Sequence, residues 1–123
     1  MRQKWWSDNM LAQGLNRRVF FRVGTNIDAI LQVRSNKYLA KIVDISTGGL
    51  QLVSSGEMLA NEMVTINFDL YKQKVTAYSK IVRAVKGDDS EFLYGCKYEY
   101  IDDLDMQKIC SFLFDTQAME RWS

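Results

Sequence analysis

Val64-Thr65-Ile66-Asn67-Phe68-Asp69-Leu70 is the stretch of this sequence that decides the fold class. Its apolar residues occupy every second position, which is the period of a strand that buries one face. Tyr71-Lys72-Gln73-Lys74 follows with the polarity of a hairpin turn, and a long strand is predicted over residues 75–85. The stretch therefore predicts an antiparallel strand pair.

The same period extends outward from this pair in both directions. Strands are predicted over residues 27–33, 38–45, 50–53, 64–70, 75–85 and 92–100, with polar turns at Arg34–Lys37 and Gly87–Ser90. Six short strands without helices between them favour closure into a barrel, because a closed barrel leaves no exposed sheet edge. The predicted fold class is mainly all-β, a six-stranded antiparallel barrel.

After residue 101 the apolar period changes to that of a helix. Asp102 or Asp103 is predicted to cap this helix, because a side-chain oxygen there can accept from its first free amides. An apolar stripe is predicted to lie on the barrel, formed by Met106, Ile109, Cys110 and Leu113. We expect residues 1–15 to be an N-terminal arm and residues 16–123 to be one domain with this C-terminal helix.

Composition narrows the classes of function. The 123 residues suit one domain, and no apolar run approaches the roughly 20 residues that cross a bilayer, so no membrane insertion is expected. The first residues lack the apolar core of a signal peptide, and two cysteines imply no disulfide framework, so the expected location is the cytoplasm. The sequence contains no His, the commonest general base and metal ligand, so we expect no enzyme, no metal and no cofactor.

Charge is distributed unevenly along the chain. Residues 1–41 carry eight Lys and Arg against two acids, a balance of +6, whereas residues 42–123 carry eight against thirteen, a balance of −5. Long nucleic acid is usually bound by basic charge spread over a broad face. The concentrated positive charge therefore favours a small anionic ligand.

Three of these eight basic residues lie within six positions, in Asn16-Arg17-Arg18-Val19-Phe20-Phe21-Arg22-Val23. Arg18 and Arg22 are four residues apart and share a face in a helix or a strand. A guanidinium is a planar fork that can bind phosphate or the O6/N7 edge of guanine with two hydrogen bonds. The segment predicts a site for a polyanion that carries bases, although a solvated basic stretch beside a core strand has the same composition.

A second candidate element is Asp44-Ile45-Ser46-Thr47-Gly48-Gly49, where a predicted strand ends. Asp44 and Ser46 point the same way in an extended chain, and a carboxylate can accept from guanine N1–H and its amino group. The two glycines permit positive φ and close approach of a ligand to the backbone. A turn that merely stabilises a hairpin through the Ser hydroxyl would look similar.

Together, Arg18-x-x-x-Arg22 and Asp44-x-Ser46-x-x-Gly49 resemble the PilZ family of cyclic di-GMP receptors. The resemblance covers roughly residues 16–115, including Tyr94-Gly95-Cys96-Lys97-Tyr98 and the closing helix. It implies a six-stranded barrel whose arginine-bearing leader wraps cyclic di-GMP against the Asp44–Gly49 turn. Arg18 and Arg22 would then hold phosphate and guanine edges.

The resemblance also implies roles for the remaining candidates. Asp44 and Ser46 would bind a guanine, Gly49 would keep this wall open, and Gly48 beside it is a further ligand-binding candidate. An arginine directly before the motif, here Arg17, is associated in the family with an intercalated pair of cyclic di-GMP molecules. Arg83, on the long predicted strand, would stack on a guanine or bond to its edge, although an exposed arginine on a strand without a ligand role has the same pattern.

Three classes of function stay open from the sequence. A receptor of this kind would change conformation on binding ligand and regulate an unidentified protein effector, with motility, exopolysaccharide or biofilm as its output. A PilZ-like adaptor would bind a protein partner without nucleotide. A barrel with basic and aromatic residues could instead bind RNA or single-stranded DNA, and the acidic second part of the chain argues against this.

Overall fold

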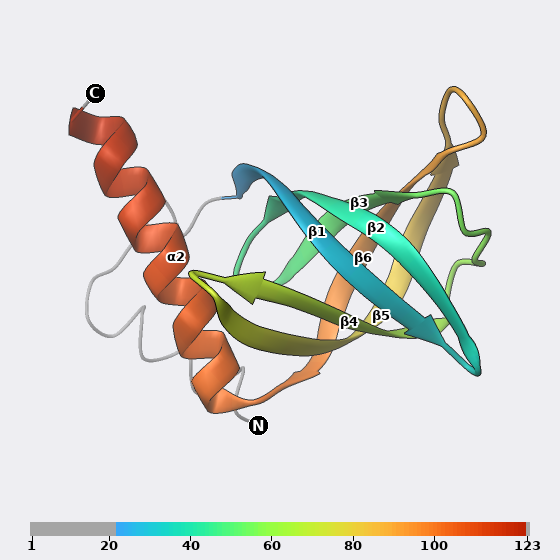
Figure 1. Cartoon of the computed structure of the whole chain (residues 1–123), viewed down its shortest axis with the longest axis horizontal. Helices are drawn as coiled ribbons and strands as arrows, with labels where there is room; N and C mark the ends of the chain where they lie inside the picture. Colours follow the sequence, from blue (N-terminus) through green and yellow to red (C-terminus); the bar gives the residue numbers. More distant parts are fainter. Residues whose placement is uncertain (1–21, 123) are drawn as a thin grey trace.

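The computed structural model describes residues 22–122, with side chains described through residue 117. It contains strands and one helix in this order: β1 (Val23–Val33), β2 (Asn36–Ile45), β3 (Gly49–Ser54), β4 (Met63–Leu70), β5 (Gln73–Lys86), β6 (Phe92–Ile101) and α2 (Asp103–Trp122). Figure 1 shows the strands wrapped around one another and α2 at one end.

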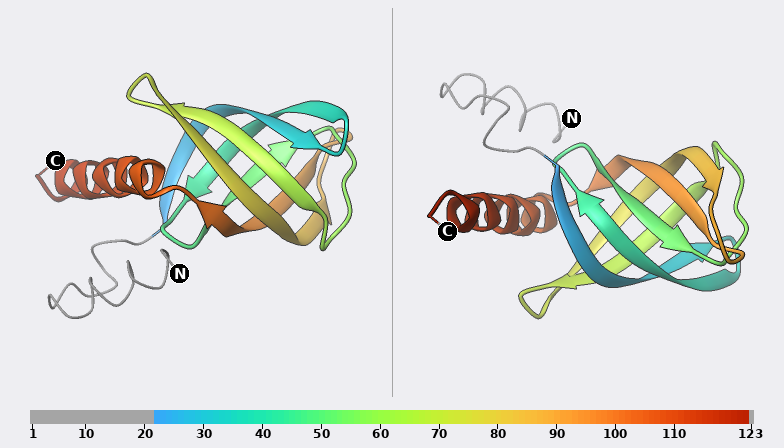
Figure 2. Two further views of the ribbon diagram at one scale, coloured as in Figure 1. Left: turned by 90° about the horizontal axis from the view of Figure 1, so that it is seen from below. Right: turned by 90° about the horizontal axis from the view of Figure 1, so that it is seen from above.

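The strands close into one antiparallel barrel in the order β1-β2-β3-β6-β5-β4, with β4 pairing back onto β1. Neighbours in sequence pair as hairpins except where the chain passes from β3 to β4, which lets β6 pair with β3. Both views of Figure 2 show this closure. The predicted fold, a six-stranded antiparallel barrel with a C-terminal helix, is confirmed.

Alternation along the strands builds the core. In β4, Val64, Ile66, Phe68 and Leu70 are buried, whereas the residues between them face outward. Corresponding side chains from the other strands fill the barrel, and the largest fully buried ones include Tyr94, Tyr98, Leu31, Ile42, Ile81 and Ile101. Burial of these apolar surfaces is the main term that stabilises the closed barrel.

The predicted boundaries of the strands were too narrow. β1 begins at Val23 rather than at residue 27, because Val23 and Gly24 pair with Ile45 and Asp44 across a register shift that hides the alternation. The turn predicted over Tyr71–Lys74 shrinks to Tyr71 and Lys72, whose φ angles are 53° and 66°. Two left-handed residues give the tight hairpin turn whose twist matches the flanking strands.

Helix α2 starts as the sequence predicted. The Asp102 carboxylate accepts from the amide of Leu104 (3.2 Å), and the Asp102 carbonyl accepts from Met106 N (2.8 Å). Met106, Ile109 and Leu113 are buried, so the predicted stripe closes one end of the barrel. Cys110, also predicted there, is half-buried.

Polar contacts fix the helix against β5. Asp105 Oδ2 accepts from the backbone amide of Thr76 (3.1 Å), and Lys108 Nζ donates to the carbonyl of Lys74 (2.9 Å). The acidic cluster at residues 102–105 therefore has a structural explanation at the start of the helix.

Candidate ligand-binding site

Arg22 and Asp44 meet at the start of β1. Arg22 Nη1 donates to Asp44 Oδ1 at 2.5 Å, and the side chains are 49% and 18% exposed. The pairing of Val23 with Ile45 and of Gly24 with Asp44 brings the residue that leads into β1 beside the end of β2. Two of the predicted ligand residues, separated by 22 positions in the sequence, are therefore in direct contact.

Arg17 and Arg18 lie outside the described residues, as does the predicted arm over residues 1–15. Their roles, and the division of the chain at residue 16, stay predictions. Arg22 is the member of the arginine motif whose position the structure gives.

The turn that follows Asp44 is held by the Ser46 side chain. Ser46 Oγ accepts from the amide of Gly48 (3.3 Å) and donates to the carbonyl of Gly49 (3.1 Å), and Ser46 N donates to that same carbonyl (2.9 Å). Neither Gly48 nor Gly49 lies in the left-handed region, so this turn does not use the conformational freedom that the two glycines permit. The Ser hydroxyl closes the turn without that conformation.

Gly49 is a glycine because β3 and β6 approach closely at this point. A Cβ at residue 49 would lie 2.1 Å from the carbonyl oxygen of Cys96, which no side chain can occupy. A Cβ at Gly48 would meet no atom within 4 Å. Gly49 is therefore required by the barrel itself, whereas Gly48 leaves open space beside the turn.

Tyr98 of β6 holds the turn in place through two hydrogen bonds. Its hydroxyl donates to the carbonyl of Ser46 (3.0 Å), and its backbone amide donates to the carbonyl of Gly48 (3.1 Å). The side chain is fully buried, and this burial raises the pKa of the phenol far above its usual value. Tyr98 thus stays a neutral donor and fixes the position of the turn relative to β6.

The strand registers place four residues in a row across the outer wall. Asp44 of β2 pairs with Gln51 of β3, Gln51 pairs with Gly95 of β6, and Gly95 pairs with Arg83 of β5. Directly opposite residues project from the same face of a sheet. The row begins at Asp44, whose carboxylate contacts Arg22, and ends at Arg83, which the sequence predicted as a ligand-binding residue.

A pocket of about 390 Å³ lies over this row, lined by Arg22, Leu50, Gln51, Val82, Arg83, Gly95 and Cys96. The structure thereby brings together Arg22, Asp44 and Arg83 from three separate parts of the sequence. Two cations line the pocket, and its described lining contains no carboxylate. Such a site favours an anion with a planar group attached.

Gln51 and Gly95 were missed as candidates from the sequence. An isolated glycine inside a strand pattern is a signal of close approach by a ligand or another backbone, and this could have indicated Gly95. Gln51 has no such local signal, because it is one of many polar residues in alternation.

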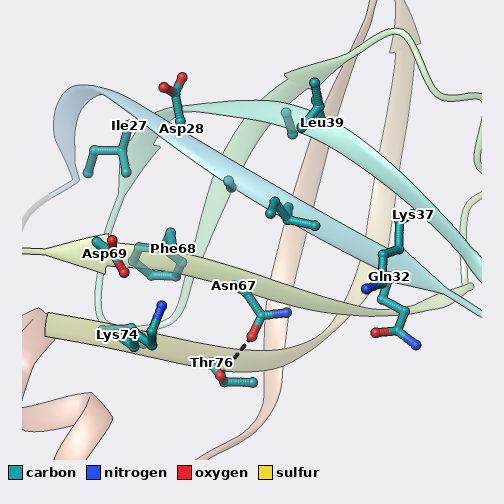
Figure 3. A pocket seen from close by; sticks show the side chains of 14 residues that line it. Ile27, Asp28, Gln32, Lys37, Leu39, Asn67, Phe68, Asp69, Lys74 and Thr76 are labelled. Carbon is teal, nitrogen blue, oxygen red and sulfur yellow. Dashed lines mark hydrogen bonds between the residues drawn. The ribbon is translucent and has the colours of Figure 1, made fainter. Parts of the chain in front are cut away.

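A larger groove of about 780 Å³ runs along β1 on a different part of the wall, between β2 and β4/β5 (Figure 3). Asp28, Asp69, Lys37 and Lys74 are the charged residues among its described lining, so acids and amines balance. Among the predicted ligand residues that the structure describes, none lies in this groove. Its carboxylates would repel phosphate, so the pocket at Gly95 is the better candidate for an anionic ligand.

The two cysteines of the described residues are buried or half-buried thiols without the features of a reactive site. Cys96 and Cys110 are free thiols, and burial raises the pKa of Cys96 to about 12 and raises that of Cys110 as well. Thiols with raised pKa values are poor nucleophiles near neutral pH. Within residues 22–122, side chains suited to holding a metal ion do not gather in any group of three, and no helix has the length and apolarity to span a membrane.

Comparison with known protein families agrees with the resemblance that the sequence motifs indicated. The family model described as the PilZ domain matches residues 16–115. None of the curated protein sequences matches the chain significantly.

Several solved structures share the fold. The inhibitor of motility MotI/DgrA of Bacillus subtilis is 17% identical with a TM-score of 0.74, over 86% of this chain and 54% of that one. The PilZ domain of YcgR from Escherichia coli, determined with c-di-GMP, is 11% identical with a TM-score of 0.65, over 86% and 95%. PlzA of Borreliella burgdorferi, in complex with c-di-GMP, is 17% identical with a TM-score of 0.60, over 87% and 45%. The chain thus spans about half the length of two of these proteins.

Proposed function

This chain belongs to the PilZ domain family, whose members are receptors and adaptors rather than enzymes, and we propose that it is a receptor for cyclic di-GMP. The observation that carries the proposal is the contact between Arg22 and Asp44 beside the pocket that Arg22 and Arg83 line. A cation for phosphate and a carboxylate for the guanine edge are thereby supplied at one place.

Each candidate has a distinct role in the proposal. Arg22, together with Arg18, binds phosphate and the O6/N7 edge of guanine. Asp44 accepts from guanine N1–H and the amino group, which adenine lacks in that arrangement. The Ser46–Gly49 turn presents its backbone and the open space at Gly48 to the ligand.

The contact between Arg22 and Asp44 is compatible with ligand entry because it is exchangeable. An exposed ion pair contributes about 0–1 kcal/mol, whereas a charge-assisted hydrogen bond to a ligand contributes about 1.5–3 kcal/mol. Arg22 is half-exposed, so its guanidinium can turn toward a phosphate at small cost. The pair then serves to hold both groups near the positions in which they act.

Signalling in this proposal depends on the segment that precedes β1. Arg17 and Arg18 are recruited to the ligand, which fixes the arm at residues 1–15 against the barrel and creates or hides a surface for a protein effector. Arg17 supplies the additional guanidinium that suits an intercalated cyclic di-GMP dimer. The proposed setting is the cytoplasm, with motility, exopolysaccharide or biofilm as the regulated process.

Isothermal titration calorimetry of the full chain with cyclic di-GMP, and with cyclic di-AMP as the matched ligand, tests the proposal. Saturable heat with cyclic di-GMP and at least tenfold weaker binding of cyclic di-AMP are expected. Absence of heat with both would reject the receptor and favour an adaptor that binds its protein partner without nucleotide. Comparable binding of any oligonucleotide, falling steeply with salt, would instead indicate a nucleic-acid-binding barrel.

A further inference from the structure

The outer wall formed by β4, β5 and β6 carries two adjacent rows of large side chains. Strand register sets these rows, because directly opposite residues project from the same face of a sheet. Each of the six residues directly precedes or follows a buried residue, so all of them project outward. We call this set the tyrosine–lysine face; it consists of Thr65, Tyr78 and Tyr100 in one row and Met63, Lys80 and Lys97 in the other.

The apolar part of the tyrosine–lysine face is large and open to solvent. Met63 is 53% exposed, and Tyr78 and Tyr100 are each 46% exposed. The rings of Tyr78 and Tyr100 contact each other, with centroids 5.9 Å apart. Tyrosine and methionine are enriched in protein–protein interfaces, where a ring supplies much apolar area together with a hydroxyl. The two rings therefore form an anchor point for an apolar side chain of another protein.

The charges on this face break the pattern of the rest of the barrel. Three pairs of directly opposite residues in the described strands join two charged side chains: Asp28 with Lys41, Asp69 with Lys74, and Lys80 with Lys97. The first two pairs join opposite charges, and Asp28 and Lys41 form an ion pair of 3.1 Å. The third pair joins two cations, which destabilises a sheet.

The two lysines of this pair are not neutralised by the described chain. Within residues 22–117, neither Lys80 nor Lys97 forms an ion pair. The fold therefore gains nothing from placing them opposite each other, and a partner that brings carboxylates would turn this cost into an attraction.

Nucleic acid fits this face less well than an acidic protein does. Two cations are far fewer than the broad basic surface that binds many phosphates. Glu99, exposed at the register shift beside Tyr100, would repel a phosphate backbone. A short acidic segment of a protein can contact the two lysines and avoid Glu99.

We propose that the tyrosine–lysine face binds the protein effector, and that the effector presents an acidic segment with a large apolar side chain beside its carboxylates. The apolar side chain packs on the rings of Tyr78 and Tyr100, and the carboxylates bind Lys80 and Lys97. None of these four residues lines the pocket beside Arg22, so effector and ligand are bound at separate places. The inference rests on the proposed function only for the existence of an effector, and it holds equally for an adaptor without nucleotide.

A library of random peptides displayed on phage supplies the probe. Selection on the native full chain, with and without saturating cyclic di-GMP, should enrich peptides that combine Asp or Glu with Leu, Phe or Trp. Fluorescence anisotropy of synthetic copies of the enriched peptides then gives their affinity for each variant.

Lys80→Glu is the most informative variant, because it converts the pair with Lys97 from like to opposite charges. Urea unfolding should show a higher midpoint than in the native chain, whereas the selected peptides should bind at least about tenfold more weakly. Tyr78→Thr removes one ring and keeps a residue that favours strands, with an expected loss of about tenfold. Lys37→Glu reverses an exposed lysine on β2 and is the matched control, which should bind the peptides as the native chain does.

Three results of the peptide experiment would each overturn the proposal: enriched peptides without an excess of acid, no enrichment with or without cyclic di-GMP, or equal affinity for Lys80→Glu and the native chain. Random oligonucleotides that bind the native chain and lose affinity in Lys80→Glu would also overturn it, because the face would then bind nucleic acid.

Calorimetry separates this inference from the proposed function. All three variants should keep the native affinity for cyclic di-GMP, and a loss in Lys80→Glu alone would place the lysine in the ligand site and overturn its role toward the effector. Absence of cyclic di-GMP binding by the native chain would reject the receptor and leave the expected peptide results unchanged.

Discussion

The guanidinium of Arg22 donates to the carboxylate of Asp44 over 2.5 Å and thereby joins the residue before β1 to the end of β2. Neither side chain could reach the other if β1 and β2 paired in a different register, because the contact depends on the pairing of Gly24 with Asp44. The barrel therefore builds one half of the proposed site before any ligand is present.

Replacing Arg22 should weaken binding of cyclic di-GMP at least tenfold, because a charge-assisted bond of about 1.5–3 kcal/mol is lost. Arg22→Asn is the variant, and calorimetry gives its affinity. Arg34→Asn is the matched control, since Arg34 also forms an exposed ion pair, with Glu62 at 2.8 Å, and asparagine tolerates its φ of 57°. Equal losses in both variants would show a nonspecific effect of charge and contradict a specific role for Arg22.

The two glycines of the turn should respond very differently to alanine. Gly49→Ala forces β3 away from β6 at the carbonyl of Cys96, with an expected loss of about 3 kcal/mol in the free energy of unfolding. Gly48→Ala meets no atom within 4 Å and should change stability by less than about 0.5 kcal/mol. Urea unfolding measures both, and similar stabilities for the two variants would refute the close approach of the strands.

Stability should fall at alkaline pH. Burial raises the pKa of Cys96 from 9.0 to about 12, so the unfolded thiol ionises first as the pH rises. The stabilisation that comes from the neutral, buried thiol is complete below about pH 9 and is lost as the pH rises toward 12. Over this range the free energy of unfolding falls by about 1.4 kcal/mol per pH unit. The raised pKa values of Tyr98 and Cys110 act in the same direction.

Urea unfolding at several pH values between about 8 and 10.5 measures this effect, where the slope approaches the full value of the linkage relation. Cys96→Ala should show a shallower decline than the native chain. A free energy of unfolding that stays constant across this range would contradict the burial of these groups.

Arg17 should control how many ligands bind. If it supports an intercalated pair, the native chain binds two cyclic di-GMP molecules, and Arg17→Ala binds one with the first affinity largely kept. Calorimetry gives the stoichiometry, and analytical ultracentrifugation checks that the chain itself does not change its oligomeric state. Binding of one cyclic di-GMP molecule per native chain would contradict the prediction that Arg17 supports an intercalated pair.

The fold could be predicted because its signals are local. The alternation over Val64–Leu70 records which face of a strand is buried, and the change of period after Ile101 marks the helix. The boundary of β1 was predicted poorly because a register shift between Gly24 and Ile27 breaks the alternation that sequence reading depends on. The bonds of the Ser46 hydroxyl to Gly48 and Gly49 are those of the serine-type turn that the sequence also allowed.

The site was only partly predictable for a related reason. Arg22 and Asp44 belong to short motifs that can be read along the chain, and their contact agrees with that reading. Gln51, Gly95 and Arg83 come together only through the registers of β3, β6 and β5, which residues far apart in sequence determine jointly. Pairing between distant strands is set by the closed barrel, so no local pattern reports it.

The central claim is that cyclic di-GMP binds between Arg22 and the wall formed by Asp44, the Ser46–Gly49 turn and the pocket at Gly95. Two-dimensional ¹H–¹⁵N NMR during titration with cyclic di-GMP tests this most directly, because it reports each amide separately. The account predicts the largest shifts at residues 22–24, 44–51, 83 and 95, with those of Ile30 and Leu39 in the larger groove unchanged. Shifts concentrated at Ile30 and Leu39, or none in either place at saturating ligand, would contradict it.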